Sequence, residues 1–140
     1  MAISKLMDVA GSGMNAQLVR MNATASNIAN AGVVAESPEL AYRAKRVVFE
    51  AALNDAMSRQ DSLYGGVKVS EVIEDTRPAR QIFDPGNPLA NDQGYVWASN
   101  VNQVAEMIDM LDASRAYQNS VEVATTAKDL MLRTLEVIRV

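Results

Sequence analysis

The sequence of 140 residues contains neither cysteine nor histidine. Without cysteine the chain has no disulfide, no thiol nucleophile and no thiolate ligand for a metal. Without histidine it lacks the commonest general base and metal ligand of proteins. These two absences argue against an enzyme, although they leave open catalysis by carboxylates or by a serine and a lysine.

Other features are scarce rather than absent. Aromatic residues make up 5% of the chain, and no run of Lys and Arg offsets the net charge of −4, which argues against a phosphate-binding surface. No stretch of about 18 apolar residues predicts a membrane span. The segment Met1 to Arg20 has no basic lead, apolar block or cleavage site, so we expect no cleaved signal peptide. On these grounds alone the default location is the cytoplasm.

The last forty residues, Val101 to Val140, contain no Gly and no Pro. Their apolar and small residues recur three or four positions apart, which predicts one long helix with a buried stripe of about 60 Å. Asn100, three residues before Gln103, is a candidate capping box for its start. The stripe consists of Val104, Ile108, Leu111, Tyr117, Val121, Ala124, Ala127, Met131, Leu135 and Ile138.

A second helix is predicted from Ser4 to Ile28, with an ending at Asn30 to Gly32, where Gly or Asn would adopt a left-handed conformation. Its stripe has a period of about 3.5 residues and consists of Met7, Gly11, Met14, Leu18, Met21, Ala25 and Ile28. Only three residues of the first thirty are charged. The helix is either an ordinary core helix or one that binds a partner, and the missing charge favours a partner.

The middle of the chain has a different character. Ala31 to Leu40 reads as a loop, and Tyr42 to Ala51 is rich in residues that favour strands. We expect a loop from Leu53 to Tyr64 and a half-buried strand from Val67 to Glu74. Arg77 to Phe83 would pair with that strand as a hairpin.

Further turns and a strand follow in the middle. Gly94 to Ala98 is predicted to be a short strand. A basic triplet near the first strand either faces solvent or meets an acidic partner, and consists of Arg43, Lys45 and Arg46. A dense group of turn formers precedes the last strand and consists of Asp84, Pro85, Gly86, Asn87 and Pro88.

No motif of a catalytic, cofactor or metal site is found. Glu71, Glu74 and Asp75 cluster near a strand end, where a divalent cation is conceivable, but their spacing fits no calcium loop and a solvated strand end is the better interpretation. Asp84 and Asp92 flank the proline turn and are interpreted as turn-capping residues. We therefore predict no catalytic residue, no cofactor and no metal.

The predicted fold is α+β and mainly α. The long terminal helices form an antiparallel coiled coil, residues 1–30 and 100–140, around a loop and β-rich insert, residues 31–99. The N-terminal helix would have about 25 residues and the C-terminal helix about 40, so the C-terminal helix would be longer by roughly 20 Å. Its excess apolar stripe indicates self-assembly or docking into a larger assembly.

Several stretches together resemble the flagellar basal-body rod proteins, most closely those of the proximal rod. The first helix ends in Ala25-Ser26-Asn27-Ile28-Ala29-Asn30-Ala31, similar to a motif of rod and hook proteins in which Ser26, Asn27, Ala29 and Asn30 match. The resemblance covers essentially the whole chain. Its other stretches are Tyr42-Arg43-Ala44-Lys45, Gly65-Gly66-Val67-Lys68-Val69, Asp84 to Ala90, Gly94-Tyr95-Val96, Asn100-Val101 and Ala113 to Gln118.

The resemblance implies a structural, non-enzymatic subunit that assembles helically into the rod and transmits torque from motor to hook. It implies export through the flagellar type III apparatus without a cleaved signal, and a location in the periplasmic rod instead of the cytoplasm. The terminal helices would line the inner tube and the middle would form the outer layer. Implied partners are FlgB, FlgF, FlgG, FliE and further copies of the chain, with no nucleic acid and no membrane insertion.

Both stripes, apart from Ala127, are then expected to be subunit interfaces, packing on each other within and between subunits. Three alternatives stay open. The first is another axial component such as FlgB, and the second is a coiled-coil adaptor that dimerises. The third is a small enzyme that uses Glu71, Glu74 or Asp75.

Overall fold

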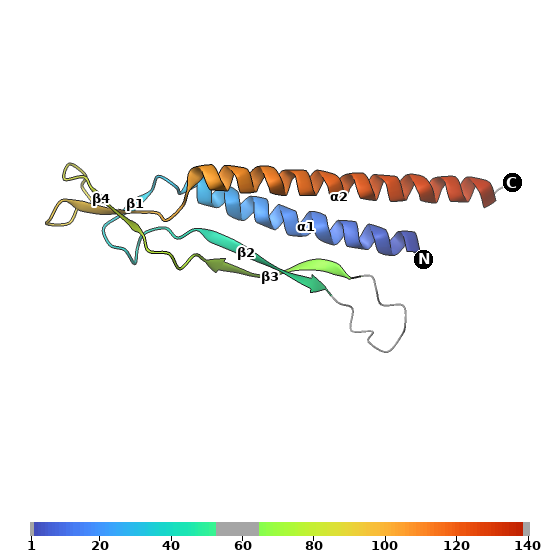
Figure 1. The fold of residues 1–140 in the computed structure, drawn as a ribbon, viewed down its shortest axis with the longest axis horizontal. Coiled ribbons are helices and arrows are strands. Elements are labelled where there is room, and N and C mark those ends of the chain that lie inside the picture. The colour runs from blue at the N-terminus through green and yellow to red at the C-terminus, as the bar shows by residue number, and fades with distance from the viewer. Residues whose placement is uncertain (1, 53–64, 139–140) are drawn as a thin grey trace.

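The structure is a computed structural model that describes residues 2–52 and 65–138, with side chains placed for residues 4–52 and 65–137. Two long helices, α1 (Ala2–Ala29) and α2 (Gln103–Ile138), lie side by side and antiparallel, with both chain termini at the same end of the molecule (Figure 1). The strands lie between them in the sequence. The predicted α+β fold, mainly α, is confirmed. The predicted loop from Leu53 to Tyr64 lies outside the described residues.

The ends of the helices differ in detail from the prediction. At the end of α1 the N–H of Asn30 bonds to the carbonyls of Ser26 and Asn27 in a tight turn. Gly32 does not adopt a positive φ, so the predicted left-handed ending is wrong. The start of α2 is capped by Asn102, whose Oδ1 accepts the N–H groups of Val104 and Ala105 at 3.1 and 3.2 Å. The predicted capping box at Asn100 is wrong because that side chain bonds elsewhere.

Small residues bring the two helices together. Ala10 and Ala16 of α1 and Ala113 and Ala127 of α2 are buried. A Cβ atom added to Gly13 would lie only 3.3 Å from Ser120 Oγ, so the helices approach closely there. Short side chains permit this approach because no bulk separates the two backbones.

The predicted stripe of α2 divides into two parts. Val104, Ile108 and Leu111 are 68, 56 and 59% exposed and do not pack on α1. Ala127 of the same stripe is buried, and Tyr117 and Ala124 are half-buried. The packing of the two stripes on each other therefore stays a prediction, with Val104, Ile108 and Leu111 excluded from the contact within one subunit. The side chain of Ile138 lies outside the described side chains.

The longer helix overhangs the shorter one by less than expected. α2 has 36 residues and α1 has 28, and the difference of 8 residues corresponds to about 12 Å. The predicted overhang of roughly 20 Å was too long because α1 begins at Ala2 instead of Ser4, and α2 begins at Gln103 instead of Val101. The contacts of Asn27 with Glu106 and of Gly13 with Ser120 fix the register, and α2 therefore continues beyond the start of α1 (Figure 1).

Five strands form two antiparallel sheets in the described part of the chain. The larger has the order β1 (Val34–Ala35), β5 (Tyr95–Ala98), β4 (Arg80–Phe83), and the smaller pairs β2 (Lys45–Ala52) with β3 (Gly66–Glu74). β4 pairs with β5 and not with β3, so the predicted hairpin is wrong. β1 falls within the predicted loop 31–40. β3 is mostly exposed rather than half-buried.

The two sheets lie in different places. The smaller sheet, which we call the β2–β3 arm, runs along α1, whereas the larger sheet lies beyond the end of the helix pair where α1 stops and α2 begins (Figure 1). The predicted proline turn joins β4 to the loop before β5. Gly94 adopts φ +80°, and a Cβ atom there would lie 3.0 Å from the Phe83 ring. No helix among the described residues is long and apolar enough to cross a membrane.

Candidate functional site

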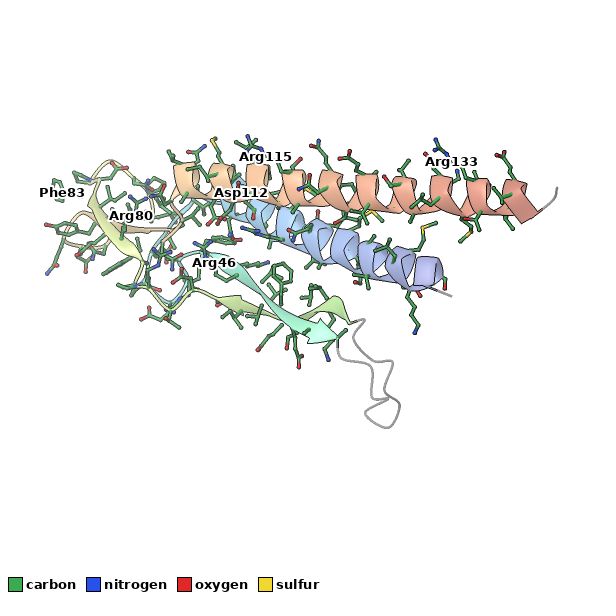
Figure 2. All side chains as sticks on the ribbon, turned by 45° about the vertical axis from the view of Figure 1, so that its right-hand side comes forward. Arg46, Arg80, Phe83, Asp112, Arg115 and Arg133 are labelled. Carbon is green, nitrogen blue, oxygen red and sulfur yellow. The ribbon has the colours of Figure 1, made fainter. Side chains whose placement is uncertain are left out.

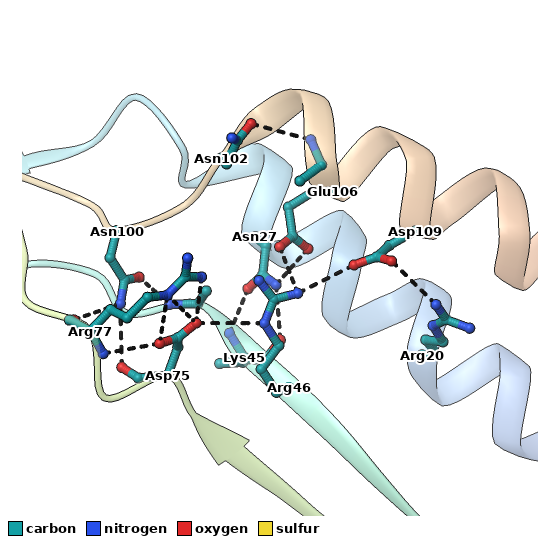
Figure 3. A network of polar contacts seen from close by, with 12 residues as sticks. Arg20, Asn27, Lys45, Arg46, Asp75, Arg77, Asn100, Asn102, Glu106 and Asp109 are labelled. Carbon is teal, nitrogen blue, oxygen red and sulfur yellow. Dashed lines mark hydrogen bonds and ion pairs between the residues drawn. The ribbon is translucent and has the colours of Figure 1, made fainter.

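Four elements meet at one place: the end of α1, the start of β2, the end of β3 and the start of α2 (Figure 3). The side chains there are polar although they are buried: Glu106, Asn27 and Ser99 are 0% exposed. Buried polar groups are costly unless each has partners, so the arrangement of these side chains is tightly constrained. We call this group the junction cluster, and it consists of Asn27, Arg46, Asp75, Arg77, Asn100 and Glu106.

Asn27 uses both ends of its side-chain amide. Its Nδ2 donates to the carbonyl of Lys45 at 2.9 Å and to Glu106 Oε2 at 2.8 Å. Its Oδ1 accepts the N–H of Lys45 at 2.7 Å and the hydroxyl of Tyr42 at 3.1 Å. The amide thus replaces a strand partner for Lys45 and fastens the start of β2 to the last turn of α1.

The neighbouring motif residues support Asn27. Ser26 Oγ lies 3.0 Å from the hydroxyl of Tyr42, which itself bonds to Asn27. Asn30 Nδ2 donates to the carbonyl of Ser26 at 2.8 Å and closes the end of the helix. Two of the stretches that carried the family resemblance, one around Asn27 and one from Tyr42 to Lys45, therefore contact each other.

Arg46 joins carboxylates from two elements. Its Nη1 lies 3.0 Å from Glu106 Oε1 and 3.3 Å from Asp109 Oδ2, and its Nε lies 3.7 Å from Asp75 Oδ2. The pair with Glu106 is an ion pair without hydrogen-bond alignment, since Glu106 Oε1 accepts no hydrogen bond. Arg20 of α1 reaches Asp109 at 3.3 Å and continues the chain of charges (Figure 3). One member of the basic triplet thus has acidic partners inside its own chain.

Asp75 and Asn100 fix the end of β3. Asp75 Oδ2 lies 2.6 Å from Arg77 Nη2, and the hydrogen bonds from the Arg77 side chain and backbone lower the pKa of Asp75 to about 2. Asn100 Nδ2 donates to the carbonyl of Arg77 at 2.9 Å, and its Oδ1 accepts the N–H of Ala44 at 2.8 Å. These bonds explain why Asn100 does not cap α2.

The carboxylates near the end of β3 do not assemble into a cation site in the described part of the chain. Asp75 is neutralised by Arg77 and Arg46, while Glu71 and Glu74 are exposed on β3. Among the described residues, no group of three or more acidic side chains could hold a metal ion. The junction cluster pairs its charges with one another, which suits a clamp that holds elements together.

Sequence reasoning named Asn27, Arg46, Asp75 and Asn100, each for a different reason, but did not bring them together. It assigned no role to Glu106, the acidic residue in the first turn of α2. A signal was present: Glu106 lies seven residues before Ala113 and so falls on the same face of α2 as the small residues that contact α1. A charge at that position requires a partner.

The predicted interface residues lie along the outer flanks of the helices. Met7, Gly11, Met14, Met21 and Ile28 are half-buried on α1, and Leu18 and Ala25 are exposed. On α2 Tyr117 and Ala124 are half-buried, and Val121, Met131 and Leu135 are exposed along with Val104, Ile108 and Leu111. As subunit interfaces these residues stay a prediction. The turn residues Asp84 to Pro88 lie at the tip of the larger sheet, where Asp84 Oδ2 accepts from Asn87 Nδ2.

Comparison with known proteins gives two family matches. The family described as flagella basal body rod protein matches residues 7–34, which span most of α1 and the turn after it. The family described as flagellar basal body rod FlgEFG protein C-terminal matches residues 92–137, which span β5 and nearly all of α2. Both termini therefore have counterparts in rod proteins.

Full-length relatives give a sharper result. The chain is 47% identical over 135 residues to the flagellar basal-body rod protein FlgC of Yersinia enterocolitica and to that of Salmonella typhimurium, covering 96% of this chain and 97% of each relative. It is 32% identical over 142 residues to FlgC of Bacillus subtilis, covering 94% of this chain and 95% of the relative. The chain belongs to the FlgC family of flagellar basal-body rod proteins, which are structural proteins and not enzymes.

Proposed function

We propose that this chain is a structural subunit of the proximal rod in the flagellar basal body. The observation that carries the proposal is the similarity to FlgC proteins along essentially the whole chain, at 47% identity over 96% of its length. The fold adds support because α2 carries large exposed apolar side chains along most of its length, on which other subunits can pack. Exposed apolar surface of this extent is typical of proteins that assemble.

The outward stripes are the proposed subunit interfaces. Val104, Ile108 and Leu111 form one apolar patch at the start of α2, and Leu132 and Leu135, three positions apart, form a second on its overhang. In a helical tube the helix pair, residues 1–30 and 100–140, would form the inner layer, and residues 31–99 would form the outer layer. The subunits would then transmit torque from motor to hook through these contacts.

The finer proposals concern partners and location. FlgB, FlgF, FlgG, FliE and further copies of the chain are the proposed neighbours, since the relatives are rod proteins and the C-terminal match is to a region of FlgEFG proteins. The subunit would reach the periplasmic rod through the flagellar type III export apparatus without a cleaved signal.

The alternatives are weaker. A rod component such as FlgB is disfavoured because the full-length relatives are named FlgC. A coiled-coil adaptor would not require the apolar overhang of α2. The enzyme hypothesis is disfavoured because the relatives are named as flagellar basal-body rod proteins, and Asp75 is held by two arginines.

The proposal is tested by deleting the gene in the organism that encodes the chain. We expect basal bodies without a complete rod and non-motile cells, and we expect the wild-type gene on a plasmid to restore both. A matched variant, Leu111→Gln, should fold and be exported but should not restore the rod. Motile deletion cells with complete rods would contradict the proposed function.

A further inference from the structure

The β2–β3 arm is held on α1 with little apolar burial. Five of its seven large apolar side chains are 37–46% exposed, although they sit in the two longest strands of the described chain. The other two, Val47 and Val69, are half-buried. The five exposed side chains are Val48, Phe49, Val67, Val72 and Ile73. An element that buries so little apolar surface gains little from the hydrophobic effect on docking. What holds it must be sought among its polar contacts.

The arm is fastened at its two ends. At the end near the start of α1, Ser12 Oγ accepts the N–H of Val67 at 3.1 Å and donates to the carbonyl of Val9 at 2.7 Å. At the other end, Asn27 holds the backbone of Lys45, and Arg46 forms ion pairs with Glu106 and Asp109 of α2. Arg46, which Figure 2 labels between β2 and the helices, is the arm's charged link to the helix pair.

Between the two fastenings the arm does not fill the space against the helices. A cavity of about 370 Å³ lies there. Arg46 is one of the residues that line this cavity. The residue that forms the ion pairs with α2 therefore also borders a volume that no side chain fills. The cavity is lined by Arg20, Ala23, Thr24, Lys45, Arg46, Val47, Phe49 and Asp109.

We propose that the β2–β3 arm is a separately movable element and that Arg46 is the latch that fixes it to the helix pair. The small-residue contact between α1 and α2 does not involve the arm, so the helix pair can persist when the arm moves. Without Arg46 the carboxylate of Glu106 would be buried without its cation, and swinging the arm away would let water reach it. The latch goes beyond the proposed rod function and does not depend on it.

The absence of cysteine makes a distance measurement practical in the full chain. Spin labels on Ser70→Cys in β3 and Gln118→Cys in α2, both exposed positions, report the distance between arm and helix pair. The test variant is Arg46→Met. The matched control is Lys68→Met, because Lys68 is also a cation of the arm but pairs with Glu50 inside the arm at 3.4 Å.

We expect one narrow distance distribution in the unsubstituted chain and in Lys68→Met, and a distribution at least twice as wide in Arg46→Met. Amide exchange at Lys45 to Val48 should rise at least tenfold in Arg46→Met, while exchange in α1 and α2 stays unchanged. A distribution in Arg46→Met equal to that of the control would overturn the proposal. So would equal loss of protection in the arm and both helices, since the arm would then not be separable.

A second variant decides the matter if Arg46→Met does not fold. Arg46→Met with Glu106→Gln leaves no buried charge without a partner and keeps an acceptor for Asn27 Nδ2. A widened distribution in this double variant supports the latch, and a narrow one contradicts it. Motility enters neither measurement, so the result is independent of whether the chain is a rod subunit.

Discussion

The side-chain amide of Asn27 pairs with the backbone of Lys45 through both of its polar atoms, at 2.9 and 2.7 Å. One residue near the end of α1 thereby sets where β2 begins. The same amide bonds to Glu106, the buried acid of α2. A single side chain thus connects three elements that are distant in the sequence, and several predictions concern its surroundings.

Replacing Asn27 by Ala should destabilise the chain by about 2–4 kcal/mol, because the N–H and carbonyl of Lys45 and the carboxylate of Glu106 lose a buried partner. Urea unfolding followed by circular dichroism measures the change. Asn30→Ala is the matched control, since Asn30 bonds to a single carbonyl in its own helix, and we expect a cost of about 1 kcal/mol or less. Equal costs for the two variants would refute a special role for Asn27.

A side chain at position 66 should clash with Ser12. A Cβ atom there would lie 2.6 Å from Ser12 Oγ, so Gly66→Ala should cost about 1–3 kcal/mol of unfolding free energy. Replacing Ser12 by Ala removes the hydroxyl that the new methyl group would meet, so the cost of Gly66→Ala should be smaller in the Ser12→Ala background. A double-mutant cycle from urea unfolding measures this difference. Gly11→Ala is the control: nothing lies within 4 Å, and we expect a gain of up to about 1 kcal/mol in helix stability. A neutral Gly66→Ala would mean that the arm does not lie this close to α1.

Two neighbouring residues of α2 should separate folding from assembly. Ala113→Leu places bulk in the helix contact, where Ala113 is 0% exposed, and should cost about 1–3 kcal/mol or more. Leu111→Gln changes an outward side chain and should stay within about 0.5 kcal/mol. In cells, however, Leu111→Gln should reduce incorporation into basal bodies at least tenfold, measured by quantitative mass spectrometry. Normal incorporation of Leu111→Gln would exclude this patch as a subunit interface.

Acid should weaken the junction through Asp75. Its pKa of about 2 in the folded chain lies below the ordinary value of 3.8, so its contribution to stability is present above about pH 4 and is lost as the pH falls toward 2. Asp75→Asn should therefore be less stable than the unsubstituted chain at pH 6, and the two should converge near pH 2. Urea midpoints between pH 6 and 2 test this. A constant difference across that range would show that the ion pairs of Asp75 do not stabilise the fold.

Much of the fold was predictable because it rests on periodicity and turn chemistry. The absence of Gly and Pro after Val101 marks α2, and the proline turn before β5 was identified from its composition. Strands β2 and β3 followed from their β-branched residues. Local sequence is sufficient for features of this kind.

The predictions that were wrong or missing concern which helices and strands contact each other. Periodicity located Val104, Ile108 and Leu111 as a stripe but did not show that these three side chains face away from α1. The contact with α1 is made there by Ala113, two positions from Leu111 and therefore on the other side of the helix. β4 lies between β3 and β5 in the sequence and pairs with β5, with Phe83 opposite Tyr95. Strand propensity alone does not decide between two neighbours of this kind. The assembly of the junction cluster was not predicted for the same reason: Arg46 and Glu106 are 60 residues apart, and nothing local in the sequence shows that they form an ion pair.

The central claim, that this chain is a subunit of the proximal rod, is tested most directly in isolated basal bodies. Cells carrying an epitope tag inserted in the exposed turn near Asp92 would supply basal bodies for antibody-gold electron microscopy and mass spectrometry. We predict gold label on the rod at its proximal end and recovery of the chain with other rod proteins. Basal bodies with complete rods that contain none of this chain would contradict the account.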